Sequence, residues 1–216
     1  MCFAADDAAP VFRLRHLPRL FGKAKLMQRM KEMILQEGTV LPGGILKVGS
    51  FLNQQVNSEF MKEIGDEIAT LFANDGVPKI LTIESSGIAL AAAAGISMHV
   101  PFVFAKKHRT SNVDGSTYTT TVHSFTHGTD YQVVVSRDYL LPTDRVLLVD
   151  DFLANGNALR GLVDLVRQSG AELVGAAVAI EKKFQGGGDE LREGGLRIES
   201  LAMIDSMTDT EITFCN

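Results

Sequence analysis

Cysteine is nearly absent from this chain. Its 216 residues include two cysteines, Cys2 and Cys215, which lie near opposite ends. Two cysteines placed in this way cannot build an internal disulfide framework, and such usage is typical of a reducing compartment. We therefore expect a cytoplasmic protein.

Long hydrophobic runs and long runs of one charge are also missing. The longest apolar candidate, residues 87–96, is rich in alanine and too short to span a membrane, so it indicates a buried helix. The formal net charge is −5, with both signs interspersed, which does not indicate a nucleic-acid-binding surface. We expect neither a membrane nor a nucleic acid as partner.

Histidines with the spacing of a metal site are missing as well. His123 and His127 would lie about 13 Å apart on an extended segment that rises ~3.3 Å per residue, which is too far to share one ion. The other histidines are isolated in the sequence. We expect no direct protein ligand to a metal.

Residues 1–26 differ in character from the rest of the chain. They contain an acidic pair, then a basic and apolar stretch that Pro18 interrupts. They lack the uninterrupted hydrophobic core of a secretory signal. We expect an N-terminal extension over 1–26, disordered or loosely docked, and one domain over 27–216. A basic helix on a membrane surface is the alternative for the extension.

Hydrophobic spacing predicts an α/β domain. Apolar side chains recur every four residues over 57–72, as in a helix that faces a core. A strand–helix–strand pattern then occurs twice, which is typical of parallel βαβ units. The expected elements after that first helix are a strand at 79–84, a helix at 87–98, a strand at 101–105, a strand at 145–149, a helix at 158–168 and a strand at 172–180.

A polar stretch separates the two units. Residues 107–131 are rich in Thr, Ser and Gly and contain β-branched runs. This composition predicts a hairpin or a flexible excursion, with Asp114–Gly115 as a turn. Such an excursion is typical of active-site lids.

The most informative motif follows the strand at 145–149. Asp150 and Asp151 come at its carboxyl end, where open α/β sheets bind ligands. The next residues form a small-residue loop that opens a helix, and its backbone N–H groups and helix dipole favour a phosphate. Two carboxylates that accept hydrogen bonds from a diol, beside an anion site, predict a ribose 5-phosphate site. The loop residues are Ala154, Asn155, Gly156, Asn157 and Ala158.

Two further segments suit neighbouring parts of a ligand. Between a strand and the next helix, hydroxyl and N–H groups of a short polar segment can hold a pyrophosphate, although such a segment can equally cap the helix. After the strand at 172–180, Lys182 can donate to a purine carbonyl and Phe184 can stack on the ring. The alternative there is a solvated lysine pair beside a core phenylalanine. The polar segment is Glu84, Ser85, Ser86 and Gly87.

Four runs of sequence together resemble the bacterial xanthine phosphoribosyltransferases, which are type I phosphoribosyltransferases. The similarity extends from about Met27 to Phe214 and implies a mainly parallel twisted sheet flanked by helices, with a flexible β flap and a small hood. It also implies that Leu46, Asn53 and Lys182 contact the purine, and that the loop at 154–158 holds the 5-phosphate. The four runs are 46–53, 83–89, 149–158 and 180–185.

The resemblance implies a reaction in purine salvage. The phosphoribosyl group of 5-phosphoribosyl 1-pyrophosphate would move to N9 of xanthine, giving xanthosine 5′-monophosphate and pyrophosphate. Asp150 and Asp151 would orient the ribose diol, and Mg²⁺ would be bound mainly through the substrate. The family forms homodimers. Asn157 and Lys183 stand where the family pattern has Gln and Ser.

Ala154 stands where related hypoxanthine–guanine enzymes carry an acidic residue. Xanthine is a more acidic purine, so a cationic Lys182 would favour its anion and reduce the need for a protein base. Two alternatives remain at this point. One is transfer to guanine, hypoxanthine or adenine, and the other is a non-catalytic regulator that senses the phosphoribosyl donor. A regulator needs a DNA-binding module, and beyond the short N-terminal stretch the sequence offers no basic region for one.

Overall fold

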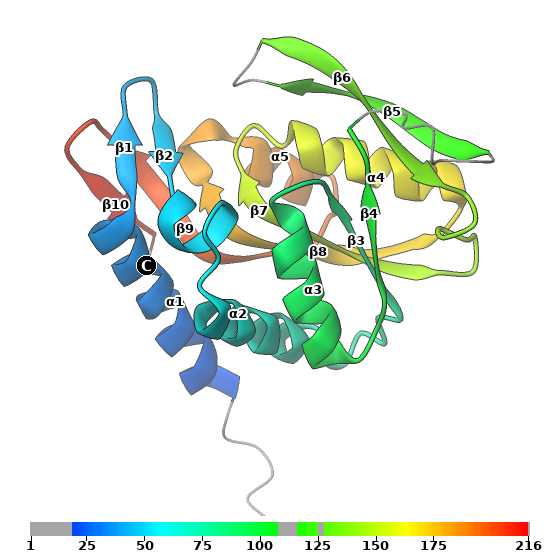
Figure 1. Ribbon diagram of the computed structural model, residues 1–216, viewed down its shortest axis with the longest axis horizontal. Coiled ribbons are helices and arrows are strands. Elements are labelled where there is room, and N and C mark those ends of the chain that lie inside the picture. Colours follow the sequence, from blue (N-terminus) through cyan, green and yellow to red (C-terminus); the bar gives the residue numbers. More distant parts are fainter. Residues whose placement is uncertain (1–18, 108–115, 125–127, 216) are drawn as a thin grey trace, which may run out of the picture.

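The computed structural model describes residues 19–107, 116–124 and 128–215 (Figure 1). Helix α1 (Arg19–Glu37) crosses the predicted boundary between the extension and the domain, and the Leu26 side chain in it is buried. Residues 1–18 lie outside the described part, so the extension stays a prediction. No helix in the described part combines the length and apolar character that crossing a membrane requires.

The centre of the fold is a six-stranded sheet with the strand order β10-β9-β8-β7-β3-β4. Neighbouring strands run parallel, except that β10 pairs with β9 antiparallel. This architecture is the predicted mainly parallel α/β sheet. The strands are β3 (Lys79–Ile83), β4 (Phe102–Ala105), β7 (Arg145–Leu153), β8 (Glu172–Lys182), β9 (Ile198–Met207) and β10 (Ile212–Phe214).

Helices cover both faces of the sheet and bury a separate apolar cluster on each (Figure 1). On one face lie α1, α2 (Ser58–Leu71) and α3 (Gly87–Met98), and on the other lie α4 (Asn157–Ser169) and α5 (Gly187–Glu193). Strand β7 serves both clusters, because Leu147 and Leu148 alternate between the two faces. A strand buried on both faces reads as a continuous apolar run, as residues 146–149 do.

Capping residues explain where two of these helices begin and end. Asn57 precedes α2, and its side chain accepts a hydrogen bond from the Phe60 N–H at 3.1 Å. The predicted stripe of α2 is confirmed, since Phe60, Ile64 and Ile68 are fully buried. Helix α4 ends at Gly170, whose φ of 76° lies in the left-handed region that glycine adopts without strain.

The polar excursion forms a hairpin, one of the two forms predicted for it. Strand β5 (Thr117–Ser124) pairs with β6 (Thr129–Ser136), and Ser124 lies opposite Thr129. The connection is therefore at residues 125–128. The turn predicted at Asp114–Gly115 lies outside the described residues and stays a prediction.

The hairpin packs along α4. The Gln168 side chain both accepts from and donates to the Thr119 backbone, at 3.3 and 2.9 Å. Nearer the start of α4, the Asn157 side chain donates to the His123 carbonyl at 3.2 Å. These bonds hold β5 along α4, with Thr119 near the end of the helix and His123 near its beginning.

A second small sheet joins β1 (Thr39–Leu41) to β2 (Ile45–Lys47), and a π-helical turn at Gly49–Asn53 follows it. This segment is the predicted hood. Strand β9, strand β10 and helix α5 have no counterpart in the sequence-based prediction, which assigned no element to residues 186–215.

Candidate functional site

The acid pair lies near the carboxyl end of β7. Strand β3 pairs with β7 only as far as Leu148, whereas β8 follows β7 to Leu153. Asp150 and Asp151 therefore lie in the part of β7 that extends past β3, with exposed fractions of 4% and 7%. The sequence predicted their place at the sheet edge, but not that the strand continues beyond them.

Asp151 forms a hydrogen bond with the hood. Its Oδ2 accepts a hydrogen bond from Asn53 Nδ2 at 3.0 Å, although 98 positions separate the two residues in the chain. Asn53 comes from the π-helical turn after β2. The structure thus brings a residue predicted to contact the purine into contact with one predicted to orient the ribose.

Asp150 has an unusual electrostatic setting. Burial raises its pKa well above the ordinary value for an aspartate, and the neighbouring charge of Asp151 raises it further. Two smaller effects lower the pKa of Asp150. The Asp151 backbone N–H donates to Asp150 Oδ1 at 2.9 Å, and the positive charge of Lys107 favours the ionised carboxylate. Burial and the charge of Asp151 outweigh these two effects, so the pKa of Asp150 is raised overall.

The predicted pyrophosphate segment reaches the same edge from β3. A β-carbon on Gly87, the first residue of α3, would lie 3.2 Å from Asp150 Oδ1, so the helix begins against the acid pair. Glu84 Oε1 accepts a hydrogen bond from the Lys107 N–H at 2.6 Å. Ser85 is exposed and Ser86 partly so, which leaves both open to a ligand.

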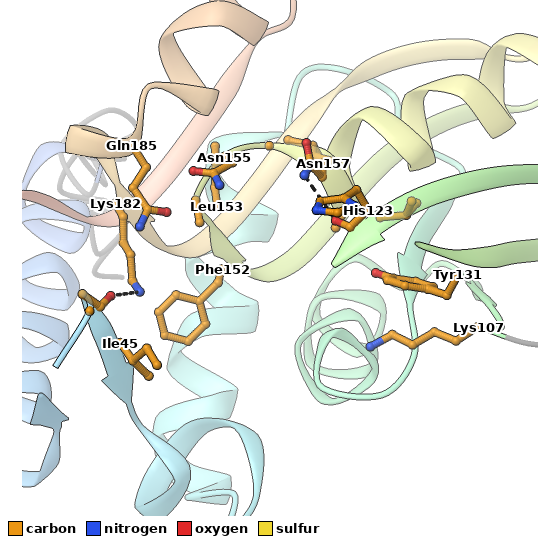
Figure 2. Close-up of a pocket in the computed structure, with 17 residues that line it drawn as sticks. Ile45, Lys107, His123, Tyr131, Phe152, Leu153, Asn155, Asn157, Lys182 and Gln185 are labelled. Atoms are coloured by element: carbon orange, nitrogen blue, oxygen red, sulfur yellow. Dashed lines mark hydrogen bonds between the residues drawn. The ribbon is translucent and has the colours of Figure 1, made fainter. Parts of the chain in front are cut away.

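A cavity of about 590 Å³ opens at this end of the sheet (Figure 2). The loop at 154–158 lines its middle, and Lys182 lines one end. All five predicted phosphate-loop residues and the predicted purine-binding lysine therefore border one space. Figure 2 shows Ile45, Phe152 and Gln185 around Lys182, and His123, Tyr131 and Lys107 at the opposite end.

The purine end of the cavity differs in detail from the prediction. Lys182 Nζ donates to the Gly44 carbonyl at 2.8 Å and lies 5.6 Å from the centre of the Phe152 ring. Burial lowers the pKa of Lys182. Phe152 lines the cavity, whereas Phe184, 42% exposed, lies in the short helical turn after β8 and does not line it.

Leu46, which is predicted to contact the purine, does not line the cavity. Its side chain is buried in the apolar cluster on the α1–α3 face, and the preceding residue, Ile45, borders the cavity instead. Alternation along β2 explains the difference, because successive side chains of a strand point to opposite sides. A purine contact by Leu46 stays a prediction.

Sequence-based reasoning missed Phe152 and Lys107. The sequence position of each residue could have indicated that it lies at the ligand-binding edge. Phe152 directly follows the acid pair, and Lys107 follows β4, whose carboxyl end lies at the ligand-binding edge. Lys107 Nζ lies 5.5 Å from the centre of the Tyr131 ring, and burial, with the charge of Asp150, raises the pKa of Tyr131.

The family model described as the phosphoribosyl transferase domain matches residues 52–190, which include the acid pair, the phosphate loop and Lys182. The chain belongs to this family. The match spans the sheet from β3 to β8 and ends within α5. The cavity described above is therefore that of a phosphoribosyltransferase.

Curated relatives in this family cover most of the chain. Xanthine phosphoribosyltransferase of Heliobacterium modesticaldum is 50% identical over 188 residues, which are 87% of this chain and 100% of that protein. Xanthine phosphoribosyltransferase of Lachnoclostridium phytofermentans is 50% identical over 181 residues, 84% of this chain and 93% of that one.

Solved phosphoribosyltransferase structures share the fold. Adenine phosphoribosyltransferase from Giardia lamblia, complexed with 9-deazaadenine, has a TM-score of 0.70 at 20% identity over 81% of this chain and 97% of that one. The Rhodothermus marinus adenine enzyme has a TM-score of 0.67 at 22% identity, with 83% and 99% coverage. The predicted type I phosphoribosyltransferase fold is confirmed.

Proposed function

We propose that this phosphoribosyltransferase transfers the 5-phosphoribosyl group from 5-phosphoribosyl 1-pyrophosphate to N9 of xanthine, releasing pyrophosphate and forming xanthosine 5′-monophosphate. The observation that carries the proposal is the single cavity that joins the phosphate loop to Lys182 and Phe152. Curated relatives that are 46–50% identical and are named xanthine phosphoribosyltransferase support the choice of base.

The donor fits the loop and the acid pair. The first N–H groups of α4 have no acceptor within the helix, so they are available to the 5-phosphate at 154–158. Asp150 and Asp151, at the same edge of the sheet, would accept hydrogen bonds from the ribose diol. The segment at 84–87 and Lys107 flank Asp150 and suit the pyrophosphate.

Positioning and charge stabilisation account for the chemistry without a protein nucleophile. As the bond between the anomeric carbon and pyrophosphate breaks, positive charge develops on the ribose, and the two carboxylates favour it. The positive charge of Lys107 favours the leaving group. With both substrates bound, N9 of xanthine attacks the anomeric carbon of the donor as pyrophosphate leaves.

Lys182 and Phe152 suit the purine. Lys182 has three N–H donors, and one is used on the Gly44 carbonyl, so the others can reach a xanthine oxygen. Its positive charge would stabilise the xanthine anion. The Phe152 ring lies beside the ammonium group, where a purine can stack on it.

We propose that Mg²⁺ enters with the donor, bound chiefly by its pyrophosphate and hydroxyl oxygens. The oxygen-rich edge around Asp150 and Asp151 fits a hydrated hard cation, which commonly binds through one or two carboxylates plus substrate phosphates. When bound, the ion would neutralise charge on the leaving pyrophosphate. Within the described residues no three His, Cys, Asp or Glu side chains gather into a site for a metal ion.

We also propose a cytoplasmic homodimer. The resemblance to the family supports the dimer, and the sparse cysteines support the location. Sedimentation equilibrium would test the dimer directly. A particle of twice the chain mass at micromolar concentration is expected, and a monomer would contradict it.

The decisive test is turnover with donor and Mg²⁺, offering xanthine, guanine, hypoxanthine and adenine separately. We expect a clear preference for xanthine in kcat/KM, because a hydrogen-bonding pocket strongly penalises a missing or reversed polar group. Preference for another base would keep the donor site and overturn the assignment of Lys182. No turnover, with donor binding intact, would favour a sensor of the donor.

A further inference from the structure

Arg160, in the first turns of α4, braces the phosphate loop from outside the cavity. Its Nη1 donates to the Asn155 carbonyl at 2.6 Å and to Asn157 Oδ1 at 3.3 Å. Its backbone N–H donates to the Gly156 carbonyl at 2.8 Å. One residue therefore binds two successive carbonyl groups of the loop.

These two bonds matter for an anion site. A peptide carbonyl carries partial negative charge, so a loop carbonyl that turned toward a bound phosphate would repel it. A charged guanidinium bound to that carbonyl is a strong restraint, because charge-assisted hydrogen bonds are about twice as strong as neutral ones. Gly156 has a φ of 81°, a left-handed conformation that the loop needs to turn into α4.

Helix α5 completes the brace. Arg160 Nη2 forms an ion pair with Glu190 of α5. Gly187, the first residue of α5, packs so tightly on the loop that a β-carbon there would overlap the Asn155 carbonyl carbon. The loop is thus held between Arg160 and α5.

The same helix is anchored at the purine end of the cavity. Glu181, next to Lys182 in β8, is fully buried and accepts two hydrogen bonds from Arg192 of α5, at 2.7 and 2.6 Å. Burial raises the pKa of Glu181, but hydrogen bonds from Arg192 and Ser200 outweigh it and lower the pKa overall. Helix α5 therefore connects the strand that carries Lys182 to the loop that Arg160 braces.

Arg160 does not itself border the cavity. Its guanidinium nitrogens are engaged with Asn155, Asn157 and Glu190, so its influence on a bound phosphate passes through the loop. A lysine at this position would keep the positive charge, but a single ammonium group cannot reproduce the planar fork that reaches these acceptors.

We propose that Arg160 is a positioning residue for the phosphoribosyl donor, which keeps the Asn155 carbonyl turned away from the 5-phosphate and so presents the loop N–H groups to it. The proposal rests on the proposed function, because it takes the donor's 5-phosphate as the ligand of the loop. It assigns no contact between Arg160 and the donor.

The test compares Arg160→Met, which keeps the apolar stem, with Arg160→Lys and with Arg167→Met. Arg167 is exposed and lies two turns further along the same helix. We expect Arg160→Met to raise the KM for the donor about tenfold to a hundredfold, the range found when a group that only orients ligand-binding groups is removed from metal sites. The kcat and the xanthine KM should change less than about threefold. Arg167→Met should match the wild type.

Arg160→Lys separates position from charge, and it should restore donor affinity only in part. Full restoration would overturn the proposal, because charge alone would then suffice. An unchanged donor KM in Arg160→Met, or a loss of thermal stability with no change in donor KM, would overturn it equally. Glu190→Gln, which weakens the ion pair and leaves Arg160 on Asn155, should give an intermediate donor KM.

Calorimetric titration with the magnesium complex of the donor separates this proposal from the proposed function. If wild-type protein bound the donor but did not use xanthine, the proposed function would fail. Weaker donor binding by Arg160→Met would still support the role of Arg160. Equal donor affinity in both proteins would overturn that role even if xanthine were the substrate.

Discussion

At the scale of single residues, Asp150 trades stability for function. Because burial and Asp151 raise its pKa, the folded protein holds this proton more tightly than the unfolded chain does. The stabilisation from Asp150 is therefore fully present below the unfolded pKa and is lost as pH rises through the raised folded pKa. This contribution is lost toward higher pH, which fits a side chain retained for ligand binding rather than for stability.

Asp150→Asn tests this trade directly. We expect the free energy of unfolding at pH 7 to exceed that of the wild type, with the difference shrinking toward pH 4. We expect kcat/KM to fall about a hundredfold to a thousandfold, as for loss of one group that stabilises transition-state charge. Urea unfolding across pH, with steady-state kinetics, measures both. Asp209→Asn, at an exposed site, is the control, and equal stabilisation there would refute the explanation.

Lys182 is the residue on which base recognition depends most in our proposal. We expect Lys182→Met to lower kcat/KM for xanthine about tenfold to a hundredfold, because it removes a charged donor, while the donor KM stays nearly constant. Lys183→Met is the matched control, because Lys183 is the next residue in the chain and its side chain is exposed. Unchanged xanthine kinetics in Lys182→Met would contradict both the purine contact and the idea that its charge favours the xanthine anion.

The two phenylalanines near the purine end make opposite predictions. Phe152 lines the cavity and Phe184 does not. We expect Phe152→Ala to raise the xanthine KM roughly tenfold, through lost stacking and lost apolar contact, and Phe184→Ala to leave it within about twofold. Steady-state kinetics with xanthine as the varied substrate decides between them. The reverse outcome would restore the role that the sequence suggested for Phe184.

At the scale of elements, the hairpin packs closely against α4 at Gly161, which has no side chain. A β-carbon on Gly161 would lie 2.5 Å from Val122 Cγ2, so α4 and β5 approach as closely as a glycine allows. The hairpin is thereby held with His123 and Tyr131 at the cavity, and His123 lies beside Asn157 (Figure 2).

Gly161→Val should displace the hairpin. Overpacking of this kind costs about 1–3 kcal/mol, so we expect backbone amides in β5 to exchange hydrogen roughly tenfold to a hundredfold faster. Hydrogen exchange followed by mass spectrometry resolves this segment, with Arg167→Met as a control on the same helix. Protection of β5 that stayed unchanged would mean that the hairpin is not held by this contact.

Elements differed in how well their local sequence predicted them. Helix α2 was readable because an amphipathic stripe and a capping Asn57 both lie within its own residues. The length of β7 was not, because pairing with β8 extends that strand past the acid pair. The register of the hairpin was not readable either, because it depends on which residues of β5 and β6 pair, and a local turn signal does not decide that.

At the scale of the molecule, the sheet joins its two apolar clusters into one structure. Phe60 belongs to the cluster under α1–α3 and Leu162 to the cluster under α4, and both are fully buried. Strands such as β7 contribute to both clusters. We therefore expect the two faces to unfold together.

Phe60→Ala and Leu162→Ala test this coupling. Each should lower the free energy of unfolding, by about 3–5 and 2–5 kcal/mol respectively, with an unchanged m-value. Urea unfolding should be followed by circular dichroism and by tyrosine fluorescence. All three tyrosines lie on the hairpin or just after it, and the chain has no tryptophan. Separate transitions by the two probes would show that the faces unfold independently.

The sequence by itself determined the α/β class and the succession of an acid pair and a small-residue loop after one strand, because that motif is contiguous. An apolar strand, two carboxylates, a small-residue loop and the start of a helix follow one another directly, so their geometry follows from local structure. Only the tertiary structure decided the contacts between distant segments. Asn53 meets Asp151 across 98 positions, and Lys182 meets Gly44 across 138. It also placed Phe152 rather than Phe184 at the cavity and set α5 against the loop, because strand pairing and helix packing bring together segments that no local pattern relates.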